Sequence, residues 1–193
     1  MSRIRLAGKI LRPVSPISIL DVGCRDGSLA AELPDADYSG ADLFPGPAVK
    51  YVGDITQLKI DRSFDTVVAM DILEHLPTPS ETFDKLFALA ERHFLISLPN
   101  TYHLKLRYNF ARKGMLNGKY LFTEAPQLDR HHWLISREEA RQFANVKAEK
   151  HGAKLKLLDM SYGAEGNRIG KVLTATLPPS LTTETVFALF TRN

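Results

Sequence analysis

The stretch Ile17-Ser18-Ile19-Leu20-Asp21-Val22-Gly23-Cys24-Arg25-Asp26-Gly27 decides the fold of this chain. Its first half is an apolar run, typical of a buried parallel strand, and the run stops at Gly23 and Gly27. Residues 28–33 are good helix formers with helical spacing, which predicts a helix directly after the turn. Strand, glycine turn and helix make the first half of a nucleotide-binding βαβ unit, although a tight turn without a ligand is the alternative.

The spacing of the glycines distinguishes between two cofactor classes. It does not match the G-x-G-x-x-G pattern of dinucleotide folds. It resembles the first motif of class I S-adenosylmethionine-dependent methyltransferases, an acidic residue followed by G-x-G-x-G, although Arg25 stands where that family usually has its middle glycine. This resemblance implies that the strand end and the turn contact the cofactor S-adenosyl-L-methionine through Asp21, Val22, Gly23, Cys24 and Gly27.

Length and composition favour one globular domain spanning residues 1–193. An apolar fraction of 44% and a charged fraction of 24% are ordinary for such a domain. No apolar run approaches the ~20 residues of a transmembrane helix. The basic N-terminus lacks the apolar core and cleavage site of a signal peptide, and a single cysteine excludes an internal disulfide. We therefore expect a cytoplasmic protein, either a monomer or a homodimer.

The charge pattern bears on possible partners. A net charge of +3, with bases spread along the chain, gives no reason to expect nucleic acid. The basic segment 1–12 favours a helix that packs Ile4, Leu6, Ile10 and Leu11 on the domain. The alternative is a weak surface association with anionic substrates or lipid head groups.

Two further acids follow predicted strands. Asp42 ends the strand predicted at 37–43, about 20 residues after Asp21, where nucleotide folds place an acid that accepts from ribose hydroxyls; an Asp that starts a turn is the alternative. Leu43 follows it at the same strand end. The strand predicted at 49–55 breaks at Gly-Asp, and the resemblance implies that Asp54 accepts from the adenine amino group while Ile55 lies against the ring.

The segment after the fourth predicted strand, 64–71, carries the most specific motif. Its string F-D-x-V-x-x-x-D-x-L-E-H-L resembles the corresponding segment of methyltransferases that act on small molecules and quinone precursors. The resemblance implies that Met70 and Asp71 border the cofactor. His75 is interpreted as a structural, hydrogen-bonded residue, with a position near the transferred methyl as the alternative.

Residues 101–135 are predicted to form a substrate-side insertion rich in aromatic and basic residues, which suits an anionic acceptor. A helical insertion that packs its aromatics on the sheet is equally compatible with this pattern. At its end, D-R-H-H-W-x-x-S-x-x-E-A-R resembles methyltransferases of bacterial surface-polysaccharide gene clusters, and Ser136 with Glu139 predicts a helix-starting capping box. His131 and His132 are candidate general bases. We expect no metal there, because adjacent side chains rarely face one ion and no cysteine or further histidine has ligand spacing nearby.

The C-terminal part completes the fold prediction. Segments 154–160 and 170–177 read as two strands with a short glycine-containing link, which requires an antiparallel pair. The apolar stretch 186–190 is expected to pack on the sheet edge or on a second subunit. The prediction is thus a Rossmann-like, doubly wound, mostly parallel seven-stranded sheet with a reversed last strand.

The function predicted from these elements is methyl transfer from S-adenosyl-L-methionine to a small-molecule acceptor, such as a sugar or another anionic metabolite. The order of glycine loop, ribose acid, adenine acid and post-strand motif supports it. A non-catalytic module that binds the cofactor and regulates a partner is one alternative. A nicotinamide-dependent oxidoreductase is another, disfavoured by the glycine spacing and by Asp54.

Overall fold

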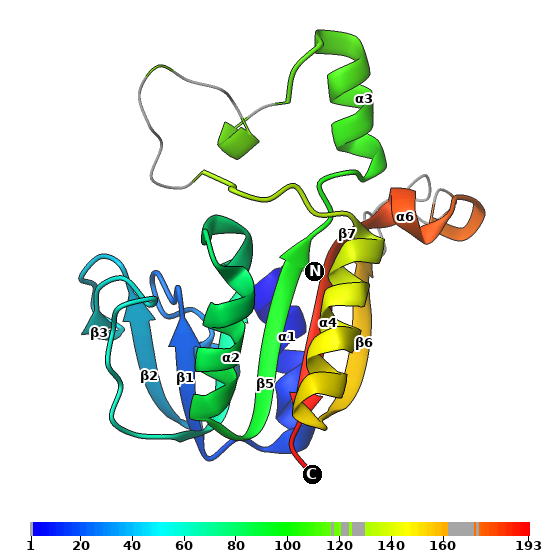
Figure 1. Ribbon diagram of the computed structural model, residues 1–193. Helices are drawn as coiled ribbons and strands as arrows, with labels where there is room; N and C mark the ends of the chain where they lie inside the picture. The colour runs from blue at the N-terminus through cyan, green and yellow to red at the C-terminus, as the bar shows by residue number, and fades with distance from the viewer. Residues whose placement is uncertain (1, 117, 121–123, 125–129, 162–171, 173) are drawn as a thin grey trace.

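The first predicted apolar strands pair in parallel and form one part of a single sheet. The computed structural model describes residues 2–116, 118–120, 124, 130–161, 172 and 174–193. Its strands are β1 (Ser18–Val22), β2 (Asp37–Asp42), β3 (Val49–Val52), β4 (Phe64–Met70), β5 (Ala90–Pro99), β6 (Lys154–Ser161) and β7 (Thr183–Thr191). They form one seven-stranded sheet in the order β3-β2-β1-β4-β5-β7-β6 (Figure 1). The first five strands are mutually parallel, and β7 is antiparallel to both β5 and β6.

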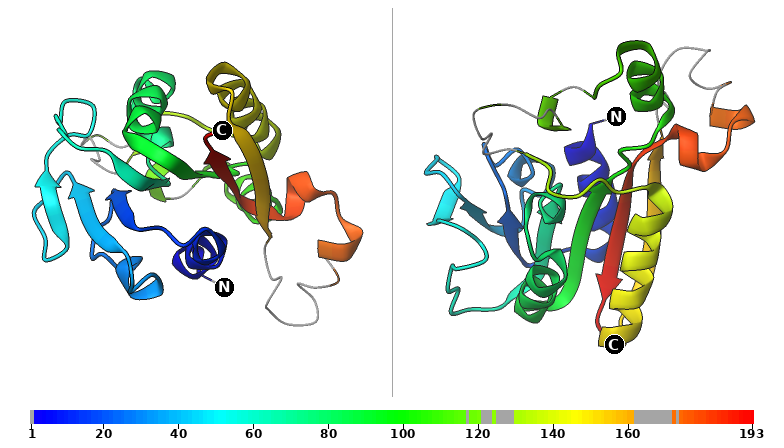
Figure 2. Two further views of the ribbon diagram at one scale, coloured as in Figure 1. Left: turned by 90° about the horizontal axis from the view of Figure 1, so that it is seen from below. Right: turned by 45° about the horizontal axis from the view of Figure 1, so that its top comes forward.

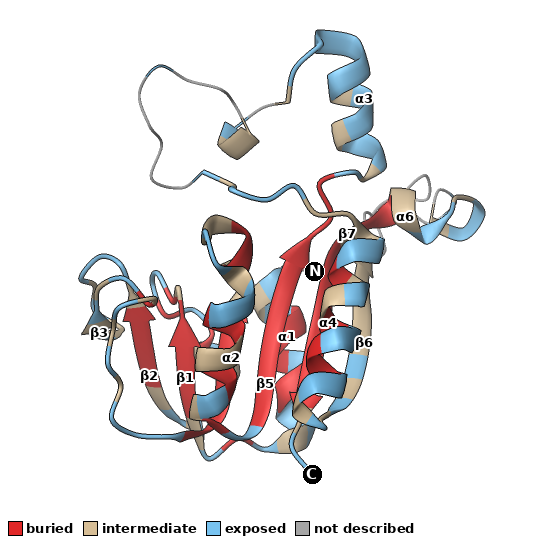
Figure 3. Ribbon diagram, in the orientation of Figure 1, coloured by how far each residue is buried: buried red, intermediate tan, exposed pale blue. Residues whose placement is uncertain are grey.

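The helices cover both faces of this sheet. The helices of the described residues are α1 (Arg3–Leu11), α2 (Pro79–Leu89), α3 (Leu104–Lys113), α4 (Arg137–His151) and α6 (Pro179–Thr182). Short 3-10 turns lie at η1 (Arg12–Val14), η2 (Ala30–Glu32), η3 (Leu73–His75) and η4 (Gly118–Tyr120). Helix α1 lies on one face and helices α2 and α4 on the other (Figure 2). Each face has its own apolar core, and the strands β1, β4, β5 and β7 between them are mostly buried, whereas β3 and β6 at the two sides of the sheet are more exposed (Figure 3). The predicted doubly wound fold is confirmed.

The reversed strand is not where the sequence predicted it. Residues 172 and 174–176 are helical, while 170, 171 and 173 lie outside the described residues, as does the predicted glycine link. The antiparallel partner of β6 is β7, so the stretch 186–190 lies inside the sheet and not at its edge. The physical reason is burial on two faces: a strand between two neighbours and two helical layers needs a continuous apolar run, which 186–190 supplies.

The helix predicted at 28–33 is shorter in the structure. Only the 3-10 turn η2 forms, at Ala30–Glu32. Pro34 follows at once, and proline restricts the residue before it and cannot continue a helix as a donor. A stretch of this length cannot offset the cost of helix nucleation.

The N-terminal segment forms the predicted packed helix. Leu6, Ile10 and Leu11 of α1 are buried, and Ile4 is partly buried against the same core. Ser2 caps the helix by accepting from the Arg5 backbone N–H at 3.2 Å. No helix in the described part of the chain has the length and apolar character that crossing a bilayer requires.

Strand β7 should be among the most sensitive elements of the fold. Phe190 is fully buried and its ring centroid lies 5.0 Å from that of Phe83, so Phe190→Ala is expected to lower the free energy of unfolding by about 3–5 kcal/mol. Phe110 in α3 is 55% exposed, and Phe110→Ala is expected to change it by less than about 0.5 kcal/mol. Urea denaturation of both variants measures the contrast, and equal losses would contradict the central position of β7.

Candidate active site

The carboxyl ends of β3, β2, β1 and β4 meet at one edge of the sheet. Val22 at the end of β1 pairs with Ala41 of β2 and with Ala69 of β4, so the loops that follow these strands are neighbours. All the cofactor-binding residues predicted from the sequence lie at this edge. Helix α3 and residues 130–135 lie beyond it, above the strand ends in Figure 1. Open parallel sheets bind their ligands at such an edge, where the strand order reverses.

The glycine turn after β1 has a backbone that favours glycine. Gly23 and Gly27 both have φ of 72°, and a Cβ on Gly23 would lie 2.1 Å from Cδ1 of Ile72. Arg25 also has a positive φ, 52°, although it carries a side chain. The side chain is exposed, so the residue that replaces the usual middle glycine keeps a glycine-like backbone and points away from the core.

Asp42 holds the glycine turn to the end of β2. Its Oδ2 accepts from the Arg25 backbone N–H at 2.9 Å, and its Oδ1 accepts from the Phe44 backbone N–H at 3.1 Å. A carboxylate has about four acceptor positions, so Asp42 retains capacity for further donors. Asp42 therefore orders a turn, as one of its two interpretations predicts, and it still offers acceptor positions at the edge.

The residues expected around an adenine ring differ in exposure. Asp54 accepts from the backbone N–H and the hydroxyl of Thr56, both at 2.8 Å, in the turn after β3. Leu43 is 50% exposed, whereas Ile55 is 8% exposed and belongs to the core. Leu43 thus offers more apolar surface at this edge than Ile55 does.

Asp21 is a buried carboxyl group at the end of β1. It is 3% exposed and accepts from the Tyr38 hydroxyl at 2.7 Å. Burial raises the pKa of Asp21 to about 7; the hydrogen bond from Tyr38 opposes this shift, and the charges of Asp42 and Asp26 add to it. A carboxyl group that titrates near neutrality, beside a glycine turn, is typical of a functional site.

Asp71, directly after β4, has a φ of 54° and is fixed from two sides. The Ser97 hydroxyl donates to Oδ1 at 2.8 Å, and the Arg3 guanidinium forms an ion pair with Oδ2. Arg3 also donates to the Thr185 hydroxyl at 3.1 Å, so helix α1 contacts both Asp71 and β7. Nothing in the sequence relates Arg3, in the basic N-terminus, to Asp71, so this contact could not be predicted from it. Met70 precedes Asp71 and is partly buried.

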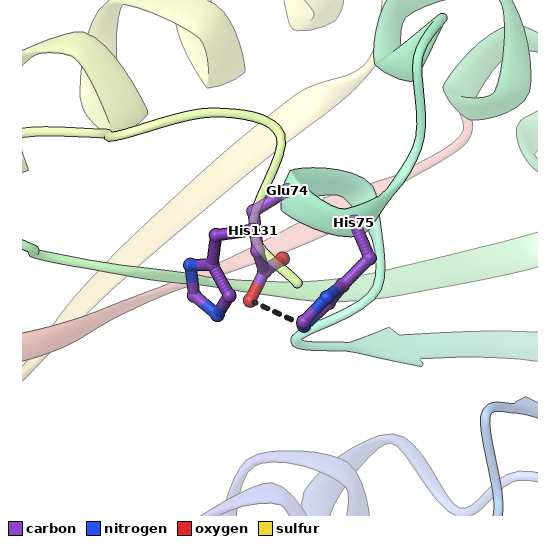
Figure 4. A group of neighbouring side chains, drawn as sticks. All are labelled: Glu74, His75 and His131. Carbon is purple, nitrogen blue, oxygen red and sulfur yellow. Dashed lines mark ion pairs between the residues drawn. The ribbon is translucent and has the colours of Figure 1, made fainter. Parts of the chain in front are cut away.

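A second group of polar side chains lies beside Asp71, in η3 and the segment that returns from the insertion. Glu74, His75 and His131 each place a possible ligand atom within 4.8 Å of the other two (Figure 4). His75 Nδ1 donates to the Arg130 carbonyl at 3.0 Å, as the structural interpretation of His75 predicts. The ring of His131 packs edge-on against that of His75, with 4.4 Å between centroids.

The two adjacent histidines have different environments. The backbone N–H groups of His132 and Trp133 donate to the Glu74 carbonyl at 2.9 and 3.2 Å, which anchors this segment on η3. His131 faces Glu74, whereas the side chain of His132 is exposed. Ligand spacing along the chain does not relate His131 to Glu74 and His75, although the Glu-His pair after β4 is a visible signal in the sequence.

An apolar pocket of about 250 Å³ lies under Trp133, between η3 and α4. Trp133 is 48% exposed and donates through Nε1 to the Leu76 carbonyl at 2.8 Å, which fixes its ring beside η3. None of the predicted cofactor-binding residues lines this pocket. The pocket and the predicted cofactor-binding residues therefore lie in different regions.

The residues at the edge fit S-adenosyl-L-methionine. A turn with positive φ, a carboxylate with remaining acceptor capacity and a half-exposed leucine suit a ligand with hydroxyls and a flat ring. This fold, with a reversed strand inserted beside β6, defines a class I methyltransferase. When bound, such a cofactor supplies an activated methyl group, and the protein supplies binding and orientation.

Comparison with known proteins agrees with this class. A family model described as a methyltransferase domain matches residues 2–148. The chain belongs to this family and is an S-adenosylmethionine-dependent methyltransferase, which excludes the oxidoreductase alternative. No protein with a curated description matches the sequence.

Solved structures share the fold at low identity. The methyltransferase domain of bacterial CtHen1 is 18% identical, with coverage of 98% of this chain and 97% of that chain and a TM-score of 0.64. The small RNA methyltransferase HEN1 is 18% identical, with coverage of 99% and 25% and a TM-score of 0.70. Magnesium protoporphyrin IX methyltransferase from Synechocystis PCC 6803, with bound S-adenosylhomocysteine, is 18% identical, with coverage of 98% and 81% and a TM-score of 0.59.

The buried carboxyl group of Asp21 should make stability depend on pH. Its pKa is about 7 in the folded chain and near 3.8 when unfolded, so between these values the unfolded chain loses its proton first and stability falls as pH rises. Asp21→Asn removes this effect. In the absence of cofactor, the free energy of unfolding of the variant relative to that of the parent should rise by on the order of 1–4 kcal/mol from pH 4 to pH 8. Urea denaturation at both pH values measures this, and a gain independent of pH would contradict the assignment.

Proposed function

We propose that this methyltransferase acts on a small-molecule acceptor, such as a sugar or another anionic metabolite, held between the carboxyl edge and the insertion at 101–135. The observation that carries this proposal is the exposed basic and aromatic surface of the insertion. Tyr102, Tyr108 and Phe110 are 41%, 61% and 55% exposed, so these three rings are available to a ligand. The exposed bases among the described residues of the same segment are Lys105, Arg107, Arg112, Lys113 and Arg130.

The insertion, and not the fold, supports the proposed class of acceptor. The structural neighbours are named as methyltransferases of small RNA, of plantazolicin and of magnesium protoporphyrin IX, which are chemically unrelated. A shared fold therefore leaves the acceptor open. A basic surface next to the cofactor edge favours an anionic acceptor, because opposite charges attract it to the site. The resemblance of the D-R-H-H-W segment to polysaccharide-cluster enzymes supports a sugar.

We assign the cofactor contacts to the residues predicted from the sequence. Asp42 accepts from the ribose hydroxyls, and Leu43 and Asp54 hold the adenine, with Ile55 supporting it from the core. The glycine turn approaches the methionine part. The complete set is Asp21, Val22, Gly23, Cys24, Gly27, Asp42, Leu43, Asp54, Ile55, Met70 and Asp71.

An acceptor screen tests the proposed class. The purified protein is incubated with methyl-labelled cofactor and three matched sets: acidic or phosphorylated sugars, RNA oligonucleotides and peptides. Label is expected in the sugar set. Transfer to RNA or to peptides alone would overturn the small-molecule proposal, and cofactor binding without transfer to any set would support the regulatory alternative.

Asp42 provides the direct test of cofactor binding. Asp42→Ala should raise the dissociation constant for S-adenosylhomocysteine at least about tenfold, because hydrogen bonds to a charged group contribute roughly 1.5–3 kcal/mol each. Asp35→Ala is the matched control, since Asp35 is exposed and lies before the amino end of β2. Calorimetry measures both, and an unchanged affinity for Asp42→Ala would remove Asp42 from the site.

His131 and His132 stay our candidates for a general base toward an acceptor hydroxyl. Replacement of the base by Asn should lower turnover about a hundredfold or more while affinity for S-adenosylhomocysteine stays level. The parent rate should rise with pH where an imidazole loses its proton, because only the neutral ring accepts one. Rates of both variants equal to that of the parent from pH 5 to 9 would exclude this role for the pair.

A further inference from the structure

We propose that Glu74, His75 and His131 form a binding site for one divalent first-row transition-metal ion. The three side chains come from two segments far apart in the sequence and converge beside the carboxyl end of β4 (Figure 4). Two imidazoles and one carboxylate are a ligand set that suits ions such as Mn²⁺, Co²⁺ and Zn²⁺, whereas Mg²⁺ and Ca²⁺ prefer oxygen ligands alone.

The carboxylate of Glu74 is the strongest argument for an ion. Its side chain is 0% exposed, and within the described part of the chain neither of its oxygens has a hydrogen-bond partner. Buried polar side chains almost always have such a partner, and buried carboxylates are paired or coordinate metals. His75 Nε2 forms only a long ion pair with Oε1, at 3.9 Å (Figure 4), which is too long for a hydrogen bond.

The tautomer of His75 fits coordination. A carbonyl oxygen can only accept, so Nδ1 carries the proton that it shares with the Arg130 carbonyl at 3.0 Å. In the neutral ring the lone pair is then on Nε2, the atom that faces Glu74. Histidines that bind metals almost always donate the other ring N–H to a carbonyl or carboxylate in this way.

The distances require only a small adjustment. Two donors bound to one ion in tetrahedral geometry, each at about 2.1 Å, stand about 3.4 Å apart. The three ligand atoms lie within 4.8 Å of one another, so side-chain movements of up to about 1.4 Å close the site. The backbone bonds from His132 and Trp133 to the Glu74 carbonyl already hold the two segments together. Asp71 is not part of the group, because Ser97 and Arg3 engage its oxygens.

An ion held by three protein ligands keeps coordination positions for water or an acceptor oxygen. Binding of an acceptor oxygen to the ion rests on the proposed function, whereas binding of the ion itself does not. Coordination also conflicts with a base role for His131, because a metal-bound nitrogen has no lone pair for a proton. The ion therefore leaves His132 as the histidine of the pair that could act as a base.

The test is metal binding by the intact chain. Protein freed of metal with a chelator is titrated with Mn²⁺ and Co²⁺ by calorimetry, and Co²⁺ is also followed by its visible absorption. We expect one ion per chain in the parent and about hundredfold or weaker binding in Glu74→Gln and His131→Asn, since even partners of metal ligands contribute 10–100-fold. His132→Asn is the matched control and should bind like the parent.

Two results would overturn the site: equal affinity in all four proteins, which indicates adventitious binding, or no binding by the parent. Affinity for S-adenosylhomocysteine, measured on the same samples, shows that each variant is folded. It also separates the two proposals. A chain that binds S-adenosylhomocysteine but no ion lacks the metal site alone, and one that binds the ion but transfers no methyl to any small molecule contradicts only the proposed function.

Discussion

The backbone conformation of Gly23 is the constraint on which the carboxyl edge depends. Its N–H donates to the Ala41 carbonyl at 2.8 Å, which joins the turn after β1 to the end of β2. The same residue faces Ile72 after β4, so closely that a Cβ would overlap it. One residue without a side chain thus lets the loops of three neighbouring strands approach one another. The Arg25 N–H then reaches the carboxylate of Asp42, and the acid is fixed beside the turn.

Carboxyl groups gather at this edge at a cost in stability. Burial raises the pKa of Asp21 to about 7 and that of Glu74 to about 8, so both are harder to ionise than in water. Asp71 lies between them along the chain and is compensated by Arg3. A core built for stability alone would not place acids here, whereas a group of carboxyl groups suits a site for a cationic ligand. S-adenosylmethionine carries a positively charged sulfonium, which carboxylates at this edge would attract.

The sequence predicted the parallel half of the fold because each of its strands is a local pattern. Apolar runs that end at a glycine or an acid mark β1 to β4, and the capping box of Ser136 and Glu139 marks the start of α4. The reversed strand was placed wrongly at 170–177, since a strand pattern there is as good locally as the one in β7. The two segments differ in that only β7 is apolar enough to be buried on both faces, as a central strand must be. Whether a strand is central depends on its neighbours in the sheet, which the local pattern does not reveal.

The candidate site likewise contains residues that the sequence predicts and a grouping that it does not predict. Asp42 could be found from its distance to the glycine turn, because consecutive parallel strands bring their ends together. The grouping of Glu74, His75 and His131 could not, because it depends on the path of the insertion. That path is set where the backbone of His132 and Trp133 bonds to the Glu74 carbonyl, a contact that carries no signature in side-chain types. Of two adjacent histidines, this contact turns His131 towards the buried carboxylate and leaves His132 exposed, so their chemistry differs although their sequence context is the same.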